Sequence, residues 1–156
     1  MDAKNRPVGP LKDRELILTR VFDAPRELVF KAWTDPKLMA RWWGPRGFEL
    51  PGADVDLRVN GRYRFTMKPP GGEPFHLTGT FLAIDPPGRL VYSFNWEEPT
   101  PDDRETVVTL TLDAHDGGTR VSLSQSLFAT GERLALHRDG WTESFEKLRE
   151  VLGTQG

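Results

Sequence analysis

Three histidines are the first candidates for acid–base or metal chemistry: His76, His115 and His137. They are too scattered for a local metal motif such as His-Glu-x-x-His, so neither a metal nor a cofactor is expected. His115 stands beside the turn at Asp116–Gly118, where water satisfies it, and His76 stands in a strand that leaves either face open to it. His137 shares a helical stripe with Trp141, and an unperturbed histidine pKa of about 6.5 suits proton exchange. The alternative for His137 is a position at the helix edge, bonded to water.

Other groups for nucleophilic or group-transfer chemistry are few. The chain has no cysteine, which excludes a thiol nucleophile, Cys-ligated zinc and a disulfide scaffold. It contains no Gly-x-Ser-x-Gly motif, phosphate-binding loop or dinucleotide fingerprint. Tyr63 and Tyr92 supply hydroxyls, but a core tyrosine is more often a structural donor. Enzymatic activity is therefore the less favoured interpretation, and no catalytic residue is assigned.

Length and charge are those of an ordinary globular protein. The 156 residues suffice for one domain with a real core. A net charge of −2 and a pI near 5.9 give no support for a nucleic-acid or anionic-membrane partner. No apolar run approaches the roughly 20 residues of a membrane span, and the polar start lacks a signal-peptide core. We expect a soluble, cytoplasmic protein with a flexible leader at residues 1–12 and a single domain at residues 13–153.

The segment Phe22–Pro45 is punctuated as two short helices. Pro25 and Pro36 each suit the first helical position, where the missing N–H has no intrahelical acceptor. Asp35 is the expected N-cap of the second helix, and Gly44-Pro45 is expected to end it. Three of the chain's five tryptophans lie in this segment. We expect the two helices to close one end of a sheet, with their tryptophans mainly in packing roles.

Alternation of polar and apolar residues, which is typical of strands, occurs before and after the two short helices. A strand is expected over Arg14–Phe22, and an antiparallel meander over Ala53–Leu127. Asn60-Gly61 predicts a type I′ hairpin with positive φ at both residues. The run Glu97–Asp103 is interpreted as a solvated hairpin loop. The other turn signals are Pro69–Gly72, Asp85–Gly88 and Asp116–Gly118.

The C-terminal segment changes to helical periodicity. Apolar residues recur every three or four positions between Gly131 and Leu152, which predicts one long helix. Gly140, in the middle of that helix, suggests a close approach or a slight bend beside Trp141. The expected α+β fold is therefore a curved antiparallel sheet of about six to seven strands, two short helices after the first strand, and one long C-terminal helix held against the sheet.

Several spaced motifs resemble a known family. The run Arg20–Val29 resembles the opening of SRPBCC (START-like) domains. Trp33–Pro36, followed by Trp42–Pro45, resembles the bacterial branch related to the C-terminal domain of the activator of the heat-shock-protein-90 ATPase. The runs Asp85–Tyr92 and Gly140–Ser144 match that branch too. The resemblance covers about Arg14 to Leu152 and implies the helix-grip fold of START-like and birch-pollen-allergen-like proteins.

This fold implies a cavity between the concave sheet and the C-terminal helix. Strand alternation selects the inward side chains, and a mostly apolar concavity with a few polar groups is the usual chemistry of a small-molecule site. The leading hypothesis is therefore the binding of a small hydrophobic or amphipathic ligand. The candidate cavity residues are Tyr63, Phe65, Met67, Phe81, Phe94, Trp96, Gln125, His137 and Trp141.

Two other functions are compatible with the resemblance. One is an enzyme of the cyclase or hydratase kind, with His137 and Tyr63 as acid–base candidates. Related proteins often carry a histidine at the position of Gln125 and a carboxylate near Ala83, and the lack of both here weakens that hypothesis. The other is a chaperone partner that stimulates a heat-shock ATPase. Because one fold serves many functions, the resemblance predicts the fold more strongly than the activity.

Overall fold

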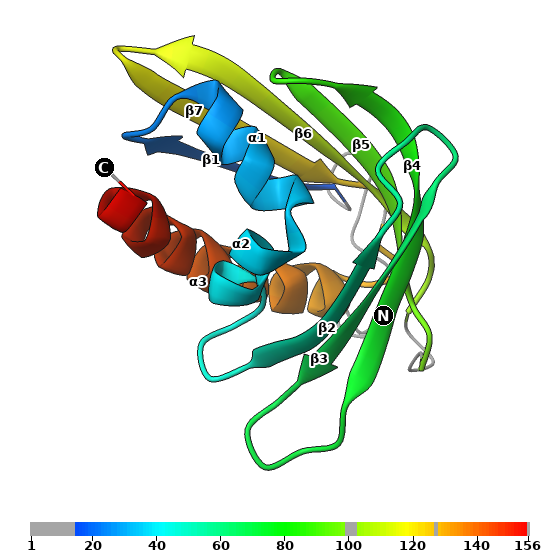
Figure 1. The fold of residues 1–156 in the computed structure, drawn as a ribbon. Helices are drawn as coiled ribbons and strands as arrows, with labels where there is room; N and C mark the ends of the chain where they lie inside the picture. The colour runs from blue at the N-terminus through cyan, green and yellow to red at the C-terminus, as the bar shows by residue number, and fades with distance from the viewer. Residues whose placement is uncertain (1–14, 99–102, 127, 156) are drawn as a thin grey trace.

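The computed structural model describes residues 15–98, 103–126 and 128–155, so the expected leader at 1–12 lies outside the described residues. A first strand is followed by two short helices, six further strands and a long helix, as predicted (Figure 1). In chain order the elements are β1 (Leu16–Phe22), α1 (Arg26–Thr34), α2 (Pro36–Trp42), β2 (Glu49–Val55), β3 (Arg62–Lys68), β4 (Phe75–Asp85), β5 (Arg89–Trp96), β6 (Thr106–His115), β7 (Gly118–Gln125) and α3 (Gly131–Gln155).

The strands form one antiparallel sheet in the order β1-β7-β6-β5-β4-β3-β2. It curls around the helices, and α3 runs across its concave side (Figure 1). From β2 to β7, each strand pairs with the next one along the chain, and β1 pairs with β7. The predicted helix-grip fold is therefore confirmed, with seven strands among the described residues.

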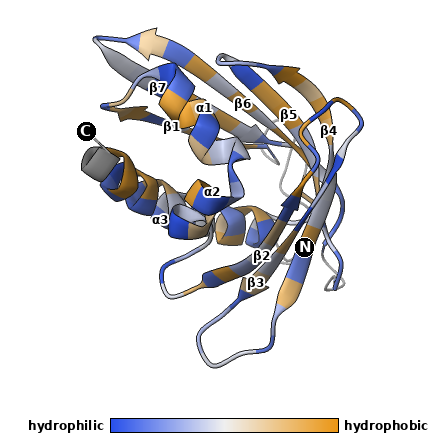
Figure 2. Cartoon of the chain, in the orientation of Figure 1, coloured by the Kyte–Doolittle hydropathy of each residue, from blue (hydrophilic) through white to orange (hydrophobic). Residues whose placement is uncertain are grey.

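The core lies between the concave face and the helices. Polar and apolar residues alternate along the strands (Figure 2), as expected for a sheet with one wet face. On β3, Tyr63, Phe65 and Met67 are almost fully buried, whereas Arg62 and Arg64 are exposed. The alternation in the sequence thus predicted the buried face of this strand.

Asp35 joins the two short helices. It is the C-cap of α1 and the N-cap of α2, where its Oδ1 accepts a 3.0 Å hydrogen bond from Lys37 N. Pro36 opens α2 as predicted, whereas Pro25 is the N-cap of α1 rather than its first residue. The Nε1 of Trp42 donates 2.9 Å to Ala32 O, so an otherwise open carbonyl near the end of α1 is satisfied.

The predicted type I′ turn at Asn60-Gly61 is wrong. Only Asn60 has positive φ, at 69°, and the connection between β2 and β3 is a longer loop. Gly61 N donates 2.8 Å to Arg58 O, and Gly61 O accepts 2.9 Å from Phe81 N on β4. A Cβ at position 61 would collide with the carbonyl oxygen of Asp56. Glycine is therefore required by close backbone approach rather than by its φ angle.

The long helix presents its apolar stripe to the sheet. Trp141, Phe145 and Leu148 are buried, and α3 contacts both α2 and β1. Phe145 packs edge-on against Phe22 of β1, with ring centroids 5.8 Å apart. In the part of the chain that the structure describes, no helix is long and apolar enough to cross a membrane.

Candidate ligand-binding cavity

A cavity of about 640 Å³ opens between the first half of α3, the loop after α2 and the ends of β3, β4 and β5. This volume lies within the range usual for small-molecule sites. The lining residues are Trp43, Gly44, Pro45, Phe48, Met67, Phe75, Phe94, Trp96, Glu98, Asp103, Arg133, Leu136, His137, Asp139, Gly140, Trp141, Glu143 and Ser144.

Aromatic rings form much of the wall. Trp43 of the α2–β2 loop meets Trp141 of α3 edge-on, with centroids 5.3 Å apart. On the sheet side, the ring centroid of Trp96 lies 5.2 Å from the ring centroids of both Phe75 and Phe94. These contacts bring three separate parts of the chain together, so the wall exists only in the folded protein.

Trp141 is held from behind by a buried polar pair. Its Nε1 donates 2.8 Å to Gln125 Oε1, and Gln125 Nε2 donates 2.8 Å to Thr106 Oγ1. Gln125 is fully buried and does not contribute to the cavity lining. The glutamine therefore fixes the orientation of the indole ring that faces the cavity.

His137 has both ring nitrogens engaged. Nδ1 lies 2.8 Å from Arg133 O, and Nε2 accepts a 3.1 Å hydrogen bond from Trp96 Nε1. A carbonyl needs a donor, so the neutral tautomer with the proton on Nδ1 satisfies both contacts. Burial lowers the pKa of His137 below its ordinary value, although the hydrogen bond to Arg133 O opposes this. His137 is therefore a neutral part of the wall at physiological pH.

An ion pair between Arg133 and Asp103 lies at the cavity. Arg133 Nη2 is 2.6 Å from Asp103 Oδ1, and the two side chains are only 19% and 8% exposed. Asp103 ends the run Glu97–Asp103, for which the sequence predicts a solvated hairpin loop. That interpretation is wrong for this residue, because the guanidinium of Arg133 draws its carboxylate inward; residues 99–102 of the run lie outside the described residues.

Lys147 fixes the loop that forms one wall of the cavity. Its Nζ donates 3.0 Å to Gly44 O and lies 3.5 Å from the carbonyl oxygens of Trp43 and Pro45. Burial lowers its pKa, and the positive charge of Arg46 adds to this effect. Gly44 has φ of 89°, which turns the chain directly after α2. A cation from α3 thus binds the backbone carbonyls of the loop that follows α2.

The nine predicted site residues lie in three places, and one of them, Gln125, is the buried residue behind Trp141. Five of them line the cavity: Met67, Phe94, Trp96, His137 and Trp141. The rings of Tyr63, Phe65 and Phe81 lie deeper, around a void of only about 10 Å³ shared with Trp33 and Tyr92. Tyr63 OH donates 2.5 Å to Ser93 O, which explains its buried hydroxyl.

Several lining residues did not emerge from the sequence. The sequence predicts a packing role for Trp43, but this residue lies in the wall of the cavity, whereas its neighbour Trp42 is wholly buried. Phe48 and Phe75 stand in or next to loops, where alternation gives no orientation. Arg133 and the lining carboxylates resemble ordinary surface charges of a helix and a loop. No local signal distinguishes these residues, because the cavity is formed by segments distant in sequence.

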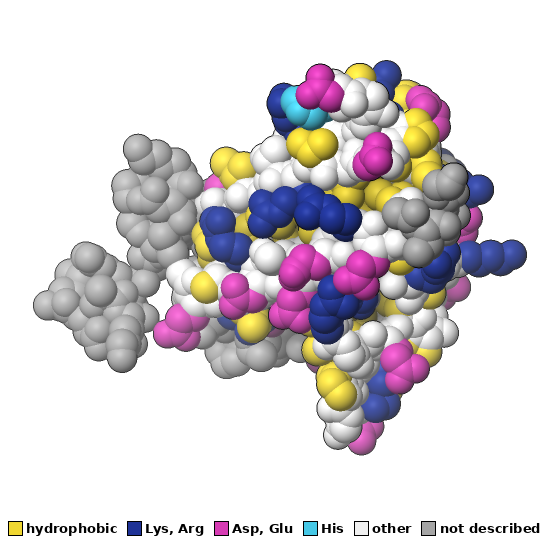
Figure 3. All heavy atoms as spheres, turned by 90° about the vertical axis from the view of Figure 1, so that its left-hand side faces the viewer, with side chains coloured by type: hydrophobic (Ala, Val, Ile, Leu, Met, Phe, Trp, Pro, Cys, Tyr) yellow, Lys and Arg dark blue, Asp and Glu magenta, His cyan; other side chains and the backbone are white. Residues whose placement is uncertain are grey.

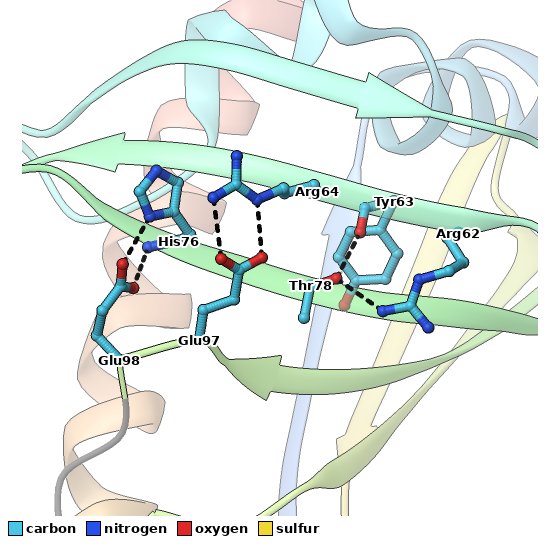
Figure 4. A network of polar contacts seen from close by, with 7 residues as sticks. All are labelled: Arg62, Tyr63, Arg64, His76, Thr78, Glu97 and Glu98. Atoms are coloured by element: carbon cyan, nitrogen blue, oxygen red, sulfur yellow. Dashed lines mark hydrogen bonds and ion pairs between the residues drawn. The ribbon is translucent and has the colours of Figure 1, made fainter.

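A polar network on the outer face of the sheet is the one place where several possible metal ligands converge among the described residues. His76, Glu97 and Glu98 offer ligand atoms within 4.8 Å of one another. However, Arg64 donates to both oxygens of Glu97 at 2.8 and 2.9 Å, and His76 Nδ1 lies 2.7 Å from Glu98 (Figure 4). A cation would have to displace these contacts, so the network serves as an ion-pair cluster joining three strands.

The curled sheet, the long helix across it and the cavity beside that helix define a helix-grip protein. The chain belongs to the family of Activator of Hsp90 ATPase homolog 1-like proteins, whose family model matches residues 23–153. The family resemblance found in the sequence is therefore confirmed. No curated protein sequence matches the chain.

Solved structures agree with this assignment. A protein from Chromobacterium violaceum is 26% identical, with a TM-score of 0.83 over 89% of this chain and 96% of that one. The AHSA1 protein of Silicibacter pomeroyi is 26% identical, with a TM-score of 0.80 over 91% and 99%. A protein from Rhodobacter sphaeroides is 27% identical, with a TM-score of 0.80 over 95% and 98%.

Proposed function

We propose that this protein binds a small hydrophobic or amphipathic molecule in the cavity beside α3. The observation that carries the proposal is an open volume of about 640 Å³ with a largely aromatic wall. Apolar surface left in contact with water favours an apolar occupant by roughly 25 cal/mol per Å² removed from water. The preformed backbone of α3 and the sheet would keep the ordering cost of binding low.

Tryptophan fluorescence offers a direct readout. Trp43, Trp96 and Trp141 contribute to the lining, whereas Trp33 and Trp42 do not. The neutral dye N-phenyl-1-naphthylamine should quench these tryptophans and gain fluorescence of its own, with saturation at one dye per protein. A set of neutral lipids, sterols and aromatic polyketides can then be tested by displacement of the dye.

A matched pair of variants separates cavity binding from surface binding. Gly140 lines the cavity, so Gly140→Leu places a side chain inside it, whereas Ala135→Leu adds the same bulk to an exposed position of α3 that lies outside the lining. We expect the first variant to lose dye binding and the second to keep it, with both variants folded by circular dichroism. Equal binding by both, or no saturable binding by the unaltered protein, would contradict the proposal.

Stimulation of a heat-shock ATPase is a second candidate, supported by membership of a family described as activator-like. This function would require a chaperone as the partner and agrees with the expected cytoplasmic location. On the face in Figure 3, basic and acidic side chains lie next to one another among scattered hydrophobic ones, which suits a polar contact with a protein. The test is the ATPase rate of the cognate chaperone with and without this protein. An unchanged rate would exclude this role.

The cyclase or hydratase alternative has less support. Both nitrogens of His137 are engaged, and Tyr63 donates to a backbone carbonyl outside the cavity lining. Neither group is placed to transfer a proton to a molecule in the cavity without first breaking its own hydrogen bond. Binding without chemistry is therefore the function that we propose first.

A further inference from the structure

Acidic residues outnumber basic residues in the lining of the cavity. Four acidic residues contribute to its lining, Glu98, Asp103, Asp139 and Glu143, against one arginine, Arg133. Asp103 lies 2.6 Å from that guanidinium, so the pair has no net charge. Three acidic residues remain: Glu98, two residues after the end of β5, and Asp139 and Glu143, one helical turn apart on α3.

No other lining residue offsets this negative charge. His137 is neutral, because its Nδ1 proton is held by Arg133 O and its Nε2 accepts from Trp96. Glu98 accepts from the backbone and ring nitrogens of His76, and these hydrogen bonds hold the pKa of Glu98 below its ordinary value. The carboxylate of Glu98 is therefore ionised at neutral pH.

Three cations outside the lining, Arg46, Lys147 and Arg64, have partners of their own. Arg46 forms an ion pair with Glu150, and its backbone N–H donates 3.0 Å to Glu143. Lys147 points its ammonium at the carbonyls after α2. Arg64 is bound to Glu97 on the outer face of the sheet (Figure 4). Among the acidic lining residues, Asp139 and Glu143 on α3 therefore have no cationic side-chain partner among these three, whereas the carboxylate of Glu98 is bound to His76.

Aromatic faces and acidic groups together favour one chemical class. A cation over the face of an indole or phenyl ring is attracted by the ring quadrupole, and most strongly by tryptophan. Trp43, Trp96 and Trp141 lie in the same lining as the three carboxylates. We infer that the cavity selects an organic cation: a protonated or quaternary amine carried on an apolar or aromatic body. This inference rests on the proposed ligand-binding function and names its ligand class.

The test compares three ligands of one size by isothermal titration calorimetry at neutral pH: 1-naphthylmethylammonium, 1-naphthylmethanol and 1-naphthoate. We expect the ammonium to bind about tenfold more tightly than the carboxylate, with the alcohol between them. The advantage of the ammonium should shrink as the salt concentration rises. Equal affinities, or tighter binding of 1-naphthoate through Arg133, would overturn the charge preference and leave the proposed function standing.

Two double variants locate the effect. Asp139→Asn with Glu143→Gln removes two lining charges while an amide oxygen remains at position 143 for Arg46 N. The affinity for the ammonium should fall by about three- to tenfold, while that for the alcohol stays unchanged. The control, Asp23→Asn with Glu27→Gln, makes the same change in net charge at exposed positions outside the lining and should change neither affinity.

Two results would overturn the inference by different routes. An equal loss in the lining and control variants would show that net charge alone attracts the cation, and so would contradict selection by the cavity. If none of the three naphthalenes binds and N-phenyl-1-naphthylamine does not bind either, then the proposed ligand-binding function fails together with the inference.

Discussion

The indole Nε1 of Trp141 donates a 2.8 Å hydrogen bond to the side-chain oxygen of Gln125, and so ties α3 to β7 behind the cavity. Thr106 on β6 accepts from the other end of the same amide at 2.8 Å. All three side chains are buried, so their polar atoms have given up water and depend on one another.

Gln125→Met should therefore destabilise the protein. Methionine keeps a similar volume but leaves the Trp141 N–H without its acceptor and Thr106 Oγ1 without its donor. We expect a loss of about 1–3 kcal/mol in the free energy of unfolding, measured by urea denaturation. Ser122→Ala, on the other face of β7, is the control and should stay within about 0.5 kcal/mol of the unaltered protein. An equal loss of stability in Gln125→Met and Ser122→Ala would contradict a stabilising role of this hydrogen-bond network.

Gly140→Ala should stabilise the protein, in contrast to most glycine replacements in it. A Cβ at Gly140 would meet only Pro45 Cγ, at 3.7 Å, an ordinary contact. Alanine is favoured over glycine inside a helix by about 1 kcal/mol, and we expect a gain of that size in a thermal or urea melt.

Gly79→Ala provides the opposite case for the same substitution. Its Cβ would collide with Ser93 O and with the ring of Tyr63, so a clear loss of stability is expected. A gain at Gly79, or a loss at Gly140, would contradict the packing described here. The suggestion from the sequence that Gly140 marks a close approach is thus limited to the mild contact with Pro45.

The two tyrosines should not ionise while the protein is folded. Burial raises the pKa of Tyr63 well above its ordinary value, and burial likewise raises that of Tyr92. The folded state then keeps protons that the unfolded chain loses above about pH 10, so stability is full below that pH and falls as pH rises through it. The slope is about 1.4 kcal/mol per pH unit for each tyrosine. Phenolate absorbance should appear only together with unfolding, and gradual ionisation in the folded protein would contradict this.

His137 should make the protein less stable on acidification. Burial lowers its pKa in the folded state, so the unfolded chain takes up a proton first as the pH falls below about 6.5. The stability is complete above that value and is lost progressively below it. Protonation of Nε2 would also place two N–H groups of His137 and Trp96 against each other.

Urea melts across this pH range check the prediction, together with NMR titration of the histidine ring protons. His137→Gln should flatten the acid limb of the stability curve, and His115→Gln on the β6–β7 hairpin is the matched control for removing a histidine. An unchanged acid limb in His137→Gln would show that the loss of stability comes from other groups.

Local patterns in the sequence were sufficient to predict the fold. Alternation on β3 identifies Tyr63, Phe65 and Met67 as buried, and Asp35-Pro36 correctly places the start of α2. These features depend on backbone periodicity and capping, which a few neighbouring residues determine. The turn at Asn60-Gly61 was predicted wrongly, because the carbonyl of Asp56 and the pairing with β4 impose its shape.

The cavity, in contrast, was decided by the tertiary structure. Periodicity predicts which face of a strand or helix points inward. It does not predict whether an inward side chain is enclosed in the core or lines a cavity. Trp42 and Trp43 are neighbours in sequence, yet one is enclosed and the other lines the cavity. Gln125 points inward as expected but ends behind Trp141, bonded to it. A cavity remains where side chains from distant segments do not fill the space between them, and only their packing in three dimensions determines where that is.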